Sequence, residues 1–410
     1  MTIKQLYNVI RASSERYMSV ESEASCRLIK ITEDADRIIE EADAFARWTP
    51  FYQFCQVDLH YYEPVQVTRK MVYEIGRKQG YRLVEEPEAV IRNKAEIRKT
   101  DLSFQGRIAS YCLYWRMWPY SINNWVPLTE LSENAAVHFE EDKNLYILEI
   151  RTEEAGNPKA GIQRLVFDPA RGYLTVREET VAYEEGQKIH TFTNDWLDLH
   201  QINGLWVPMK IVWFDDNVNM RGEYAVQSIR VNESSSRNQI KIEFPEGTQI
   251  TDHILGVEYR TRQKESPDAF LGRVAESSQG VSSILPPAAT DEQLAEAASK
   301  GRQLLQQQTE AGDKKSLAIY PEYVWIEPGR KEYILTLGEE KDRRPTLKSH
   351  QFAGGGLMLH ELKDQISENG QIRLTIERPA AMTGYDEGTL ELDFAGERKT
   401  IHLVAPPLLD

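Results

Sequence analysis

The stretch from about Phe167 to Tyr259 constrains the fold most, because short turn signals recur there between β-rich segments. Residues 168–172 (DPARG) place Pro early and Gly late, as turns require, and residues 184–186 (EEG) form a second such signal. Asn203-Gly204 is typical of a two-residue hairpin. Strands joined by such short turns are antiparallel neighbours, so we expect a mainly β (α+β) chain with these strands inside a larger sheet.

The segments before this stretch show other periodicities. Apolar residues on one helical stripe predict an amphipathic helix within the first twenty residues, and the alternation in residues 22–32 predicts a strand. Residues 33–48 are acidic with helical spacing, which predicts a second helix that ends before Pro50. Further strands are expected from Phe51 onward, with a hairpin turn around Arg77–Gln79, and at Leu145–Glu153.

The chain is too long for one ordinary core, since it has 410 residues. We expect one domain over residues 1–261 and a linker with a helix over residues 262–316. Residues 317–410 contain short strands and turns, which predict a small β-sandwich. This last part lacks the Cys…Trp…Cys core of antibody domains, so Ig-like describes its architecture only.

Charge and hydropathy exclude several partners. The formal net charge of −15 argues against non-specific binding to nucleic acid or an anionic membrane surface, because phosphates would be repelled. No run approaches the roughly 18 apolar residues that cross a bilayer, so no membrane-spanning segment is expected. The first twenty residues contain no apolar signal region, so the protein is either cytoplasmic or has had a signal removed.

The residues that usually carry metal or covalent chemistry form no recognisable motif. Cys26, Cys55 and Cys112 are far apart and form no CxxC, so buried free thiols are expected, with one disulfide plus one free thiol as the alternative. The eight histidines show no metal-ligand spacing, and no nucleotide-binding or nucleophile-elbow motif occurs. The sequence therefore predicts no metal, no cofactor and no catalytic residue.

Three weaker features have both a functional and a structural interpretation. His190 and His200 could approach each other, although hydrogen-bonded strand histidines are the simpler interpretation. The residues 354–356 are all glycine and could let the backbone approach a ligand or form a flexible loop. Acidic pairs at Glu85-Glu86, Glu140-Glu141 and Asp215-Asp216 would support a glycan hydrolase only if two carboxylates converged across a cleft.

An aromatic cluster within fifteen residues is the strongest candidate for ligand binding. Such side chains bury a large apolar area and keep a polar tip, so in a curved sheet they could line a hydrophobic cavity. Core and lid packing is the alternative, and a cavity wall is also core. The predicted ligand-binding residues are Tyr111, Tyr114, Trp115, Trp118, Tyr120 and Trp125.

Three motifs in residues 1–260 carry a family resemblance. FDPARGYLTVREE resembles the strand-turn-strand of bacterial outer-membrane-lipoprotein-sorting (LolA/LolB-like) proteins, and NGLWVPMKIVWF, with its Gly-x-Trp-x-Pro step, resembles a later strand of that family. IEFPEGTQITDHILGVEY resembles the end of the domain in a divergent branch found in envelope proteins of planctomycete-like bacteria. The acidic segment 33–48 and the aromatic segment after Tyr111 depart from the simplest family pattern.

The resemblance implies a curved, unclosed antiparallel β-barrel with helices packed in its mouth, and a protein that does no covalent chemistry. It implies a periplasmic or other extracytoplasmic binding or sensor protein that holds a hydrophobic ligand, such as an acyl chain, lipoprotein or peptide. No individual ligand residue carries over, because the motifs identify the scaffold strands. The alternative is a structural or protein-interaction component of a cell-envelope assembly, with an envelope protein as partner and no small ligand.

Overall fold

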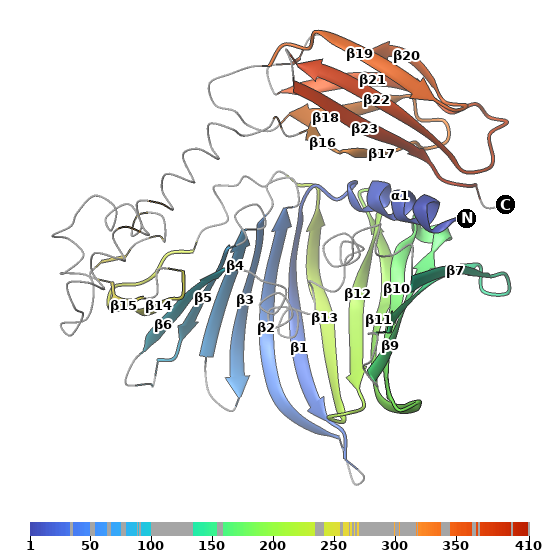
Figure 1. The fold of residues 1–410 in the computed structure, drawn as a ribbon. Helices are drawn as coiled ribbons and strands as arrows, with labels where there is room; N and C mark the ends of the chain where they lie inside the picture. Colours follow the sequence, from blue (N-terminus) through green and yellow to red (C-terminus); the bar gives the residue numbers. More distant parts are fainter. Residues whose placement is uncertain are drawn as a thin grey trace.

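The computed structural model describes most of the chain outside residues 100–133 and 270–316. Its described residues are 1–32, 36–49, 54–63, 67–74, 79–87, 89, 92–99, 134–153, 159–233, 242–254, 257–261, 263–264, 266, 269, 299, 303, 317, 319–337, 345–362, 366–367, 370–394 and 397–408. They form one large curved sheet, the helix α1 (Ile3–Ser14) at one end of it, and two small sheets beyond the helix (Figure 1). This arrangement confirms the expected mainly β fold with an unclosed antiparallel sheet.

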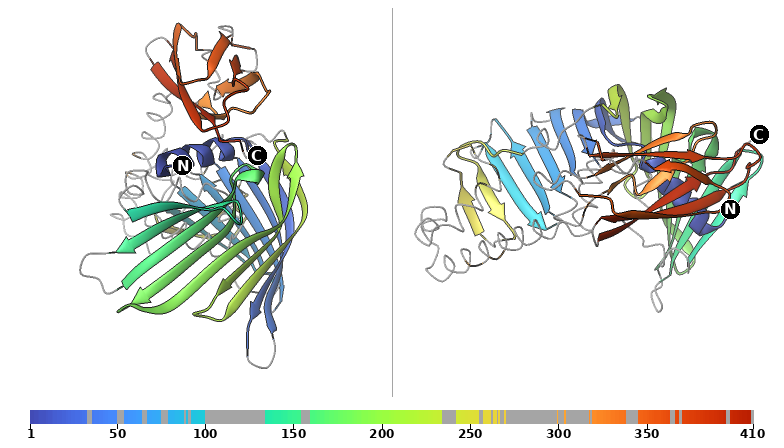
Figure 2. Two further views of the ribbon diagram at one scale, coloured as in Figure 1. Left: turned by 90° about the vertical axis from the view of Figure 1, so that its right-hand side faces the viewer. Right: turned by 90° about the horizontal axis from the view of Figure 1, so that it is seen from above.

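The large sheet has fifteen strands in the order β15-β14-β6-β5-β4-β3-β2-β1-β13-β12-β11-β10-β9-β8-β7. All neighbours are antiparallel except β6 and β14, and β7 and β15 form its two edges. Figure 2 (left) shows the green strands facing the blue strands across the inside of the sheet. The strands are β1 (Val20–Lys30), β2 (Arg37–Thr49), β3 (Phe54–Glu63), β4 (Val67–Glu74), β5 (Gln79–Glu85), β6 (Asn93–Lys99), β7 (Ala135–Glu140), β8 (Leu145–Glu153), β9 (Lys159–Asp168), β10 (Leu174–Glu184), β11 (Gln187–Ile202), β12 (Leu205–Asp215), β13 (Met220–Val231), β14 (Gln249–Asp252) and β15 (Val257–Arg260).

The turns that join β9 to β12 form where the sequence predicts them. The first contains the short 3-10 helix η1 (Pro169–Arg171), which the Asp168 carboxylate caps and which ends at Gly172 with φ of 68°. Gly186 has φ of 78°, while Asn203 and Gly204 have φ of 50° and 75°. These residue types adopt left-handed backbone at low cost, so each strand reverses onto its neighbour and the predicted antiparallel run is confirmed.

The predicted acidic helix over residues 33–48 is wrong, because β2 occupies most of that segment as a strand. Strand β2 is hydrogen-bonded along both sides, to β1 and to β3. Ala42, Ala44 and Ala46 are buried on one face, so the apolar period is two. Alanine and glutamate are good helix formers, but helix propensity amounts to less than about 1 kcal/mol per residue, and pairing with a strand on either side overrides it.

The predicted N-terminal helix is confirmed as α1, which begins with a capping box formed by Thr2 and Gln5. Its apolar stripe packs on one face of the large sheet, where Leu6 and Val9 join a buried cluster with Leu165 and Phe167. The Ser13 hydroxyl also donates a hydrogen bond to the carbonyl of Gly172, in the turn after β9. Helix α1 is thereby fixed at one end of the curved sheet.

The C-terminal strands form two four-stranded sheets, in the orders β16-β18-β21-β20 and β17-β23-β22-β19. Leu335 and Leu374 of the first sheet and Leu390 and Leu403 of the second are completely buried in one shared core. The strands are β16 (Ile319–Tyr320), β17 (Tyr323–Trp325), β18 (Glu332–Leu337), β19 (Ser349–Gly354), β20 (Met358–Leu362), β21 (Gln371–Glu377), β22 (Asp386–Phe394) and β23 (Glu397–Ala405).

The glycine run after β19 encloses a side chain of the protein itself. The N–H of Gly356 donates to the Asp386 carboxylate over 2.7 Å, and a Cβ on Gly355 would lie 2.3 Å from the same carboxylate. The close backbone approach that the glycines allow is therefore to Asp386.

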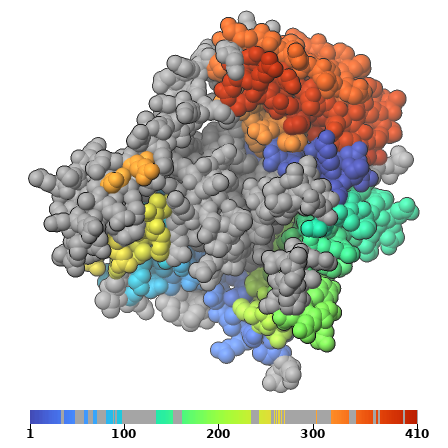
Figure 3. Space-filling view, viewed as in Figure 1, coloured from blue at the N-terminus to red at the C-terminus, as the bar shows by residue number. Residues whose placement is uncertain are grey.

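Helix α1 also contacts the C-terminal sheets, as Figure 3 shows for the blue and the orange to red atoms. Glu15, at the end of α1, accepts hydrogen bonds from the N–H groups of Glu322 (2.6 Å) and Tyr323 (2.9 Å) and pairs with Arg11 at 3.0 Å. Arg16 pairs with Glu327 at 3.0 Å. The helix is thus held between the two parts of the molecule by charged and apolar contacts.

Candidate ligand-binding face of the curved sheet

The candidate site lies on the inner face of the large sheet, defined here as the face that packs against α1. Leu165 lies on this face, and its register partner across β9 and β10 is Glu178. Glu178 pairs in turn with Asn194 of β11, which pairs with Trp213 of β12. Residues directly opposite each other share a face, so all four side chains point to the inside of the sheet.

Most of this inner floor is apolar and buried. Ala24 of β1 lies opposite Ala44 of β2, and both small side chains lie between Leu59 of β3 and the strand that carries Tyr224. The inner face is therefore shallow at this pair of alanines. The buried residues of the cluster are Tyr17, Val20, Ala24, Ala44, Ala46, Leu59, Trp196, Leu205, Val207, Ile211, Tyr224 and Val231.

A glycine shapes the same floor by making room for an indole ring. Trp213 stacks on Phe192, with ring centroids 6.0 Å apart, and its register partner on β13 is Gly222. A Cβ on Gly222 would lie 1.9 Å from the Trp213 Nε1 atom. The indole therefore lies across the backbone of β13, a position that any side chain at residue 222 would block.

Unpaired polar groups are buried in this floor. Asn194 is 0% exposed, and neither its amide nitrogen nor its amide oxygen has a hydrogen-bond partner among the described residues. Glu178 is 6% exposed and accepts one hydrogen bond, 2.8 Å long, from the Gln163 amide. The Nε1 atoms of Trp196 and Trp213 also have no partner within the described part of the chain. A buried polar group without a partner costs about 1–3 kcal/mol, so these atoms call for an explanation.

Cys26 is a free thiol on β1, opposite Tyr224. Burial and, to a smaller extent, the negative charge of Asp43 raise the pKa of this thiol. It is therefore protonated and unreactive at neutral pH. The side chain of Cys55 and all of Cys112 lie outside the described residues.

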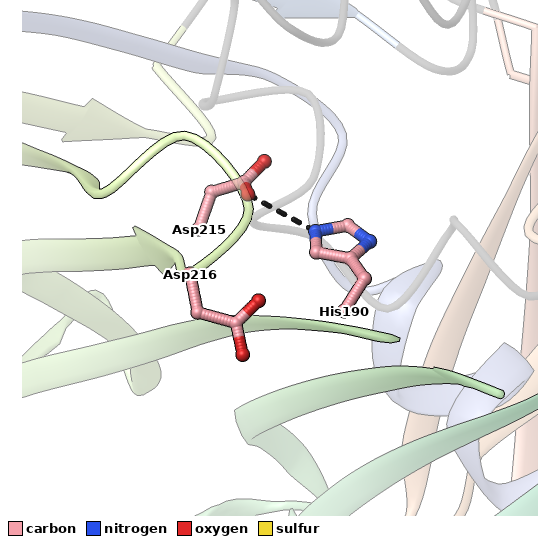
Figure 4. A group of neighbouring side chains, drawn as sticks. All are labelled: His190, Asp215 and Asp216. Carbon is pink, nitrogen blue, oxygen red and sulfur yellow. Dashed lines mark hydrogen bonds and ion pairs between the residues drawn. The ribbon is translucent and has the colours of Figure 1, made fainter. Parts of the chain in front are cut away.

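His190, Asp215 and Asp216 form a group at the end of the inner face away from α1 (Figure 4), and their ligand atoms lie within 4.8 Å of one another. Such donors suit a divalent cation in principle. Each carboxylate already has a structural role, however: Asp215 Oδ1 accepts from His190 Nε2 at 3.0 Å and from the N–H of Asn217 at 3.0 Å. Asp216 Oδ1 accepts from the N–H of Thr191 at 2.6 Å. The group therefore joins the β12–β13 turn to the start of β11.

His190 and His200 are hydrogen-bonded strand residues, which is the simpler of the two interpretations that the sequence allowed. His190 pairs with Asp215, whereas His200 pairs with Asp198 at 3.1 Å, near the other end of β11. The three acidic pairs belong to β5, β7 and β12, which are separated in the strand order of the sheet by at least four strands. Glu140 instead pairs with Lys143, at 2.7 Å, in the turn after β7.

The opposite, outer face of β7–β11 carries a groove of about 990 Å³. Its charged side chains pair with one another: Arg164 lies 3.0 Å from Glu149 and 2.9 Å from Glu179, and Arg177 lies 3.1 Å from Asp195. Hydrogen bonds to Arg164 lower the pKa of Glu149. The groove is lined by mutually satisfied charges and contrasts with the inner face.

The six predicted aromatic ligand-binding residues, from Tyr111 to Trp125, lie outside the described residues. The polar residues Gln163, Glu178 and Asn194 escaped the sequence analysis, because their importance depends on strand register. The available signal was the alternation of Phe192, Asn194 and Trp196, which places an amide between two aromatic side chains on one face of a strand.

The comparisons with known proteins come from solved structures alone. No family model matches the chain, and no curated protein sequence matches it. A DUF1329 family protein from Desulfovibrio piger is similar at 12% identity and a TM-score of 0.37, over 57% of this chain and 94% of that one. An outer membrane lipoprotein-sorting protein domain from Vibrio parahaemolyticus matches at 10% identity and a TM-score of 0.38, over 58% and 95% of the two chains. A LolA superfamily protein from Nitrosomonas europaea matches at 10% identity and a TM-score of 0.32, over 58% and 100%.

These values do not establish membership of a family. The chain's own geometry must therefore identify what the inner face can do. Among the described residues, no helix is long and apolar enough to cross a membrane.

Proposed function

We propose that this chain is an extracytoplasmic, non-enzymatic binding or sensor protein that holds a hydrophobic ligand against the inner face of its curved sheet. The observation that carries the proposal is the buried apolar floor formed by β1–β3 and β11–β13, with α1 fixed at one end. Burying apolar area contributes roughly 25 cal/mol per Å², so an acyl chain or an apolar peptide would gain most from this surface.

The short side chains of Ala24, Ala44 and Ala46 are where such a ligand would lie closest to the backbone. The aromatic side chains of Tyr111, Tyr114, Trp115, Trp118, Tyr120 and Trp125 are the proposed ligand contacts, as their density in the sequence suggests. The similarity to lipoprotein-sorting domains motivates an acyl chain or lipoprotein as ligand and a periplasmic location. The division into residues 1–261, a linker and residues 317–410 is part of this proposal, with the C-terminal sheets as an accessory interaction module.

Ligand binding can be tested by filling the inner face. An environment-sensitive apolar dye is titrated into the purified full chain and displaced with dodecanoic acid derivatives, and lipids that copurify are extracted for mass spectrometry. The substitution Ala44→Leu adds three carbon atoms on the inner face and should weaken dye binding about tenfold, because they take up space that the ligand would occupy. The neighbouring Asp43→Leu adds a similar side chain on the outer face and should leave binding unchanged.

Thermal melts of both variants establish that they remain folded. No dye binding and no copurifying lipid would overturn the proposal, as would equal binding by the folded Ala44→Leu variant.

A second candidate function is a structural or protein-interaction component of an envelope assembly. It is favoured by β7, which is an edge strand among the described strands and where Phe139 is 42% exposed and packs on Tyr146 with ring centroids 4.7 Å apart. Unpaired edge strands are templates for pairing with another chain. Size-exclusion chromatography with light scattering at several concentrations tests self-association, and a strict monomer would count against this role for a second copy of the chain.

A further inference from the structure

The unpaired polar groups on the inner face restrict the chemistry of the ligand. We infer that the ligand carries an uncharged amide beside its apolar chain, and that Asn194 and Glu178 recognise this group. The inference rests on the proposed function, because it assigns the polar end of the ligand that the apolar floor would hold.

Asn194 supplies the first argument. Its side chain is completely buried, yet neither amide atom has a partner among the described residues. Asn194 Oδ1 needs a hydrogen-bond donor, and Nδ2 needs an acceptor. Such a residue does not stabilise the fold, since a leucine of the same branched shape would remove the cost of the unpaired atoms. A ligand group that both donates and accepts would satisfy both atoms of the Asn194 amide.

The indoles and Glu178 narrow the choice. The N–H groups of Trp196 and Trp213 are further donors without a partner in the described part of the chain, and they favour a carbonyl. Glu178 lies directly opposite Asn194, and its hydrogen-bond partner among the described residues is the neutral amide of Gln163. A carboxylate or phosphate on the ligand would therefore be repelled by Glu178. The cations nearest in sequence, Arg164 and Arg177, point to the outer face and are paired there.

The common polar groups meet these requirements to different extents. A hydroxyl is uncharged and both donates and accepts, but it does so through a single oxygen atom, whereas the Asn194 amide presents two separate atoms. An ester accepts but does not donate, an ammonium donates but does not accept, and a carboxylate carries the wrong charge. An amide accepts through its carbonyl and donates through its N–H without carrying charge. The unpaired groups on the inner face therefore favour an amide-linked acyl chain or a peptide over a free fatty acid or a phospholipid headgroup.

Four probes with the same chain length test the assignment: N-methyldodecanamide, methyl dodecanoate, dodecanol and dodecanoate. Each is titrated into the full chain by displacement of the apolar dye. The amide should bind about tenfold more tightly than the ester, because one additional good hydrogen bond changes affinity by roughly that factor. Dodecanoate should bind most weakly at neutral pH.

Three variants identify the groups responsible. Asn194→Leu should raise the melting temperature and reduce the affinity for the amide to that for the ester, while ester binding stays the same. Glu178→Gln should increase the affinity for dodecanoate about tenfold. Asp195→Asn changes the neighbouring residue on the outer face and should alter none of the four affinities.

The outcomes separate this inference from the proposed function. If the dye and all four probes fail to bind, the proposed function itself is wrong. If the probes bind but the amide has no advantage over ester and dodecanol, or if Asn194→Leu weakens all four equally, the apolar site stands and the amide assignment is overturned. A lower melting temperature for Asn194→Leu would show that Asn194 is structural and would also overturn it.

Discussion

The two faces of strands β8–β11 differ in how their polar groups are satisfied. On the outer face, Arg164 bridges Glu149 and Glu179 across three neighbouring strands. One residue along the same strands, on the inner face, Glu178 and Asn194 lie opposite each other, and Asn194 has no partner among the described residues. Polar side chains of neighbouring residues are thus paired on the outer face and unpaired on the inner face of the same strands.

This difference separates groups that stabilise the sheet from groups that cost it stability. Partly exposed ion pairs such as those of Arg164 contribute about 1 kcal/mol each and are screened by salt. Buried unpaired groups lower stability by more than such ion pairs raise it, so their presence calls for a role other than stabilising the fold. The ion pairs on the outer face favour one strand register. The unpaired groups on the inner face are the ones that the proposed ligand would contact.

The largest expected effect concerns Glu15, a buried carboxyl group at the contact between the end of α1 and the C-terminal sheets. Burial raises the pKa of Glu15 to about 7, and Arg11 and the N–H groups of Glu322 and Tyr323 offset only part of this increase. Between pH 4.5 and 7 the folded state keeps a proton that the unfolded state releases. The contribution of Glu15 to stability should therefore be largest below pH 4.5 and fall by about 3 kcal/mol as pH rises to 7.

Urea unfolding at several pH values measures this slope, and Glu15→Gln should flatten it. Glu149 on the outer face should behave in the opposite way, because its lowered pKa contributes stability at neutral pH that is lost as acid protonates it. An unchanged slope in Glu15→Gln would remove Glu15 as the cause.

The next largest effect should come from Gly222 on the inner face. The substitution Gly222→Val would push the Trp213 ring out of its place across β13, since even a Cβ would lie 1.9 Å from Nε1. We expect a loss of about 2 kcal/mol in stability, with red-shifted tryptophan fluorescence. Glu223→Val, one residue along on the outer face, is the matched control and should change the emission maximum little. Equal effects of the two substitutions would contradict the assignment of the faces.

The sequence predicts the parts of the fold that depend on local residue chemistry. The turns at Gly172, Gly186 and Asn203-Gly204 were predictable because their residue types tolerate left-handed backbone. Strand β2 was not, because alanine and glutamate suit a helix equally well and only pairing with β1 and β3 decides the outcome. Long-range pairing outweighs local preference in such a segment.

The role of the polar groups on the inner face could not be predicted from the sequence for a related reason. Asn194 and Asp195 are adjacent polar residues, and the alternation of Asn194 with Phe192 and Trp196 is the one local sign of which residue faces inward. A shift of one residue in register would exchange their roles. Their environments follow from the pairing of β11 with β10 and β12, which is a property of the whole sheet.

A smaller effect is expected from breaking the ion pairs on the outer face. Arg164→Met removes the pairs with Glu149 and Glu179, and it should cost about 1 kcal/mol at low ionic strength. The loss should shrink in 1 M NaCl, because screening already weakens these pairs. Dye binding on the inner face should be unchanged. A loss of dye binding would show that the two faces are coupled.

The smallest effect is expected where the inner face ends, at His190. Its hydrogen bond to Asp215 is half-exposed, and Asp215 also accepts from the backbone N–H of Asn217, so His190→Ala should cost only about 0.5 kcal/mol. Because backbone N–H groups already occupy oxygens of Asp215 and Asp216, neither EDTA nor Zn²⁺ should shift the melting temperature. An increase with Zn²⁺ in the unmodified protein that disappears in His190→Ala would instead identify a metal site, and the inner face would then have a cation at its open end.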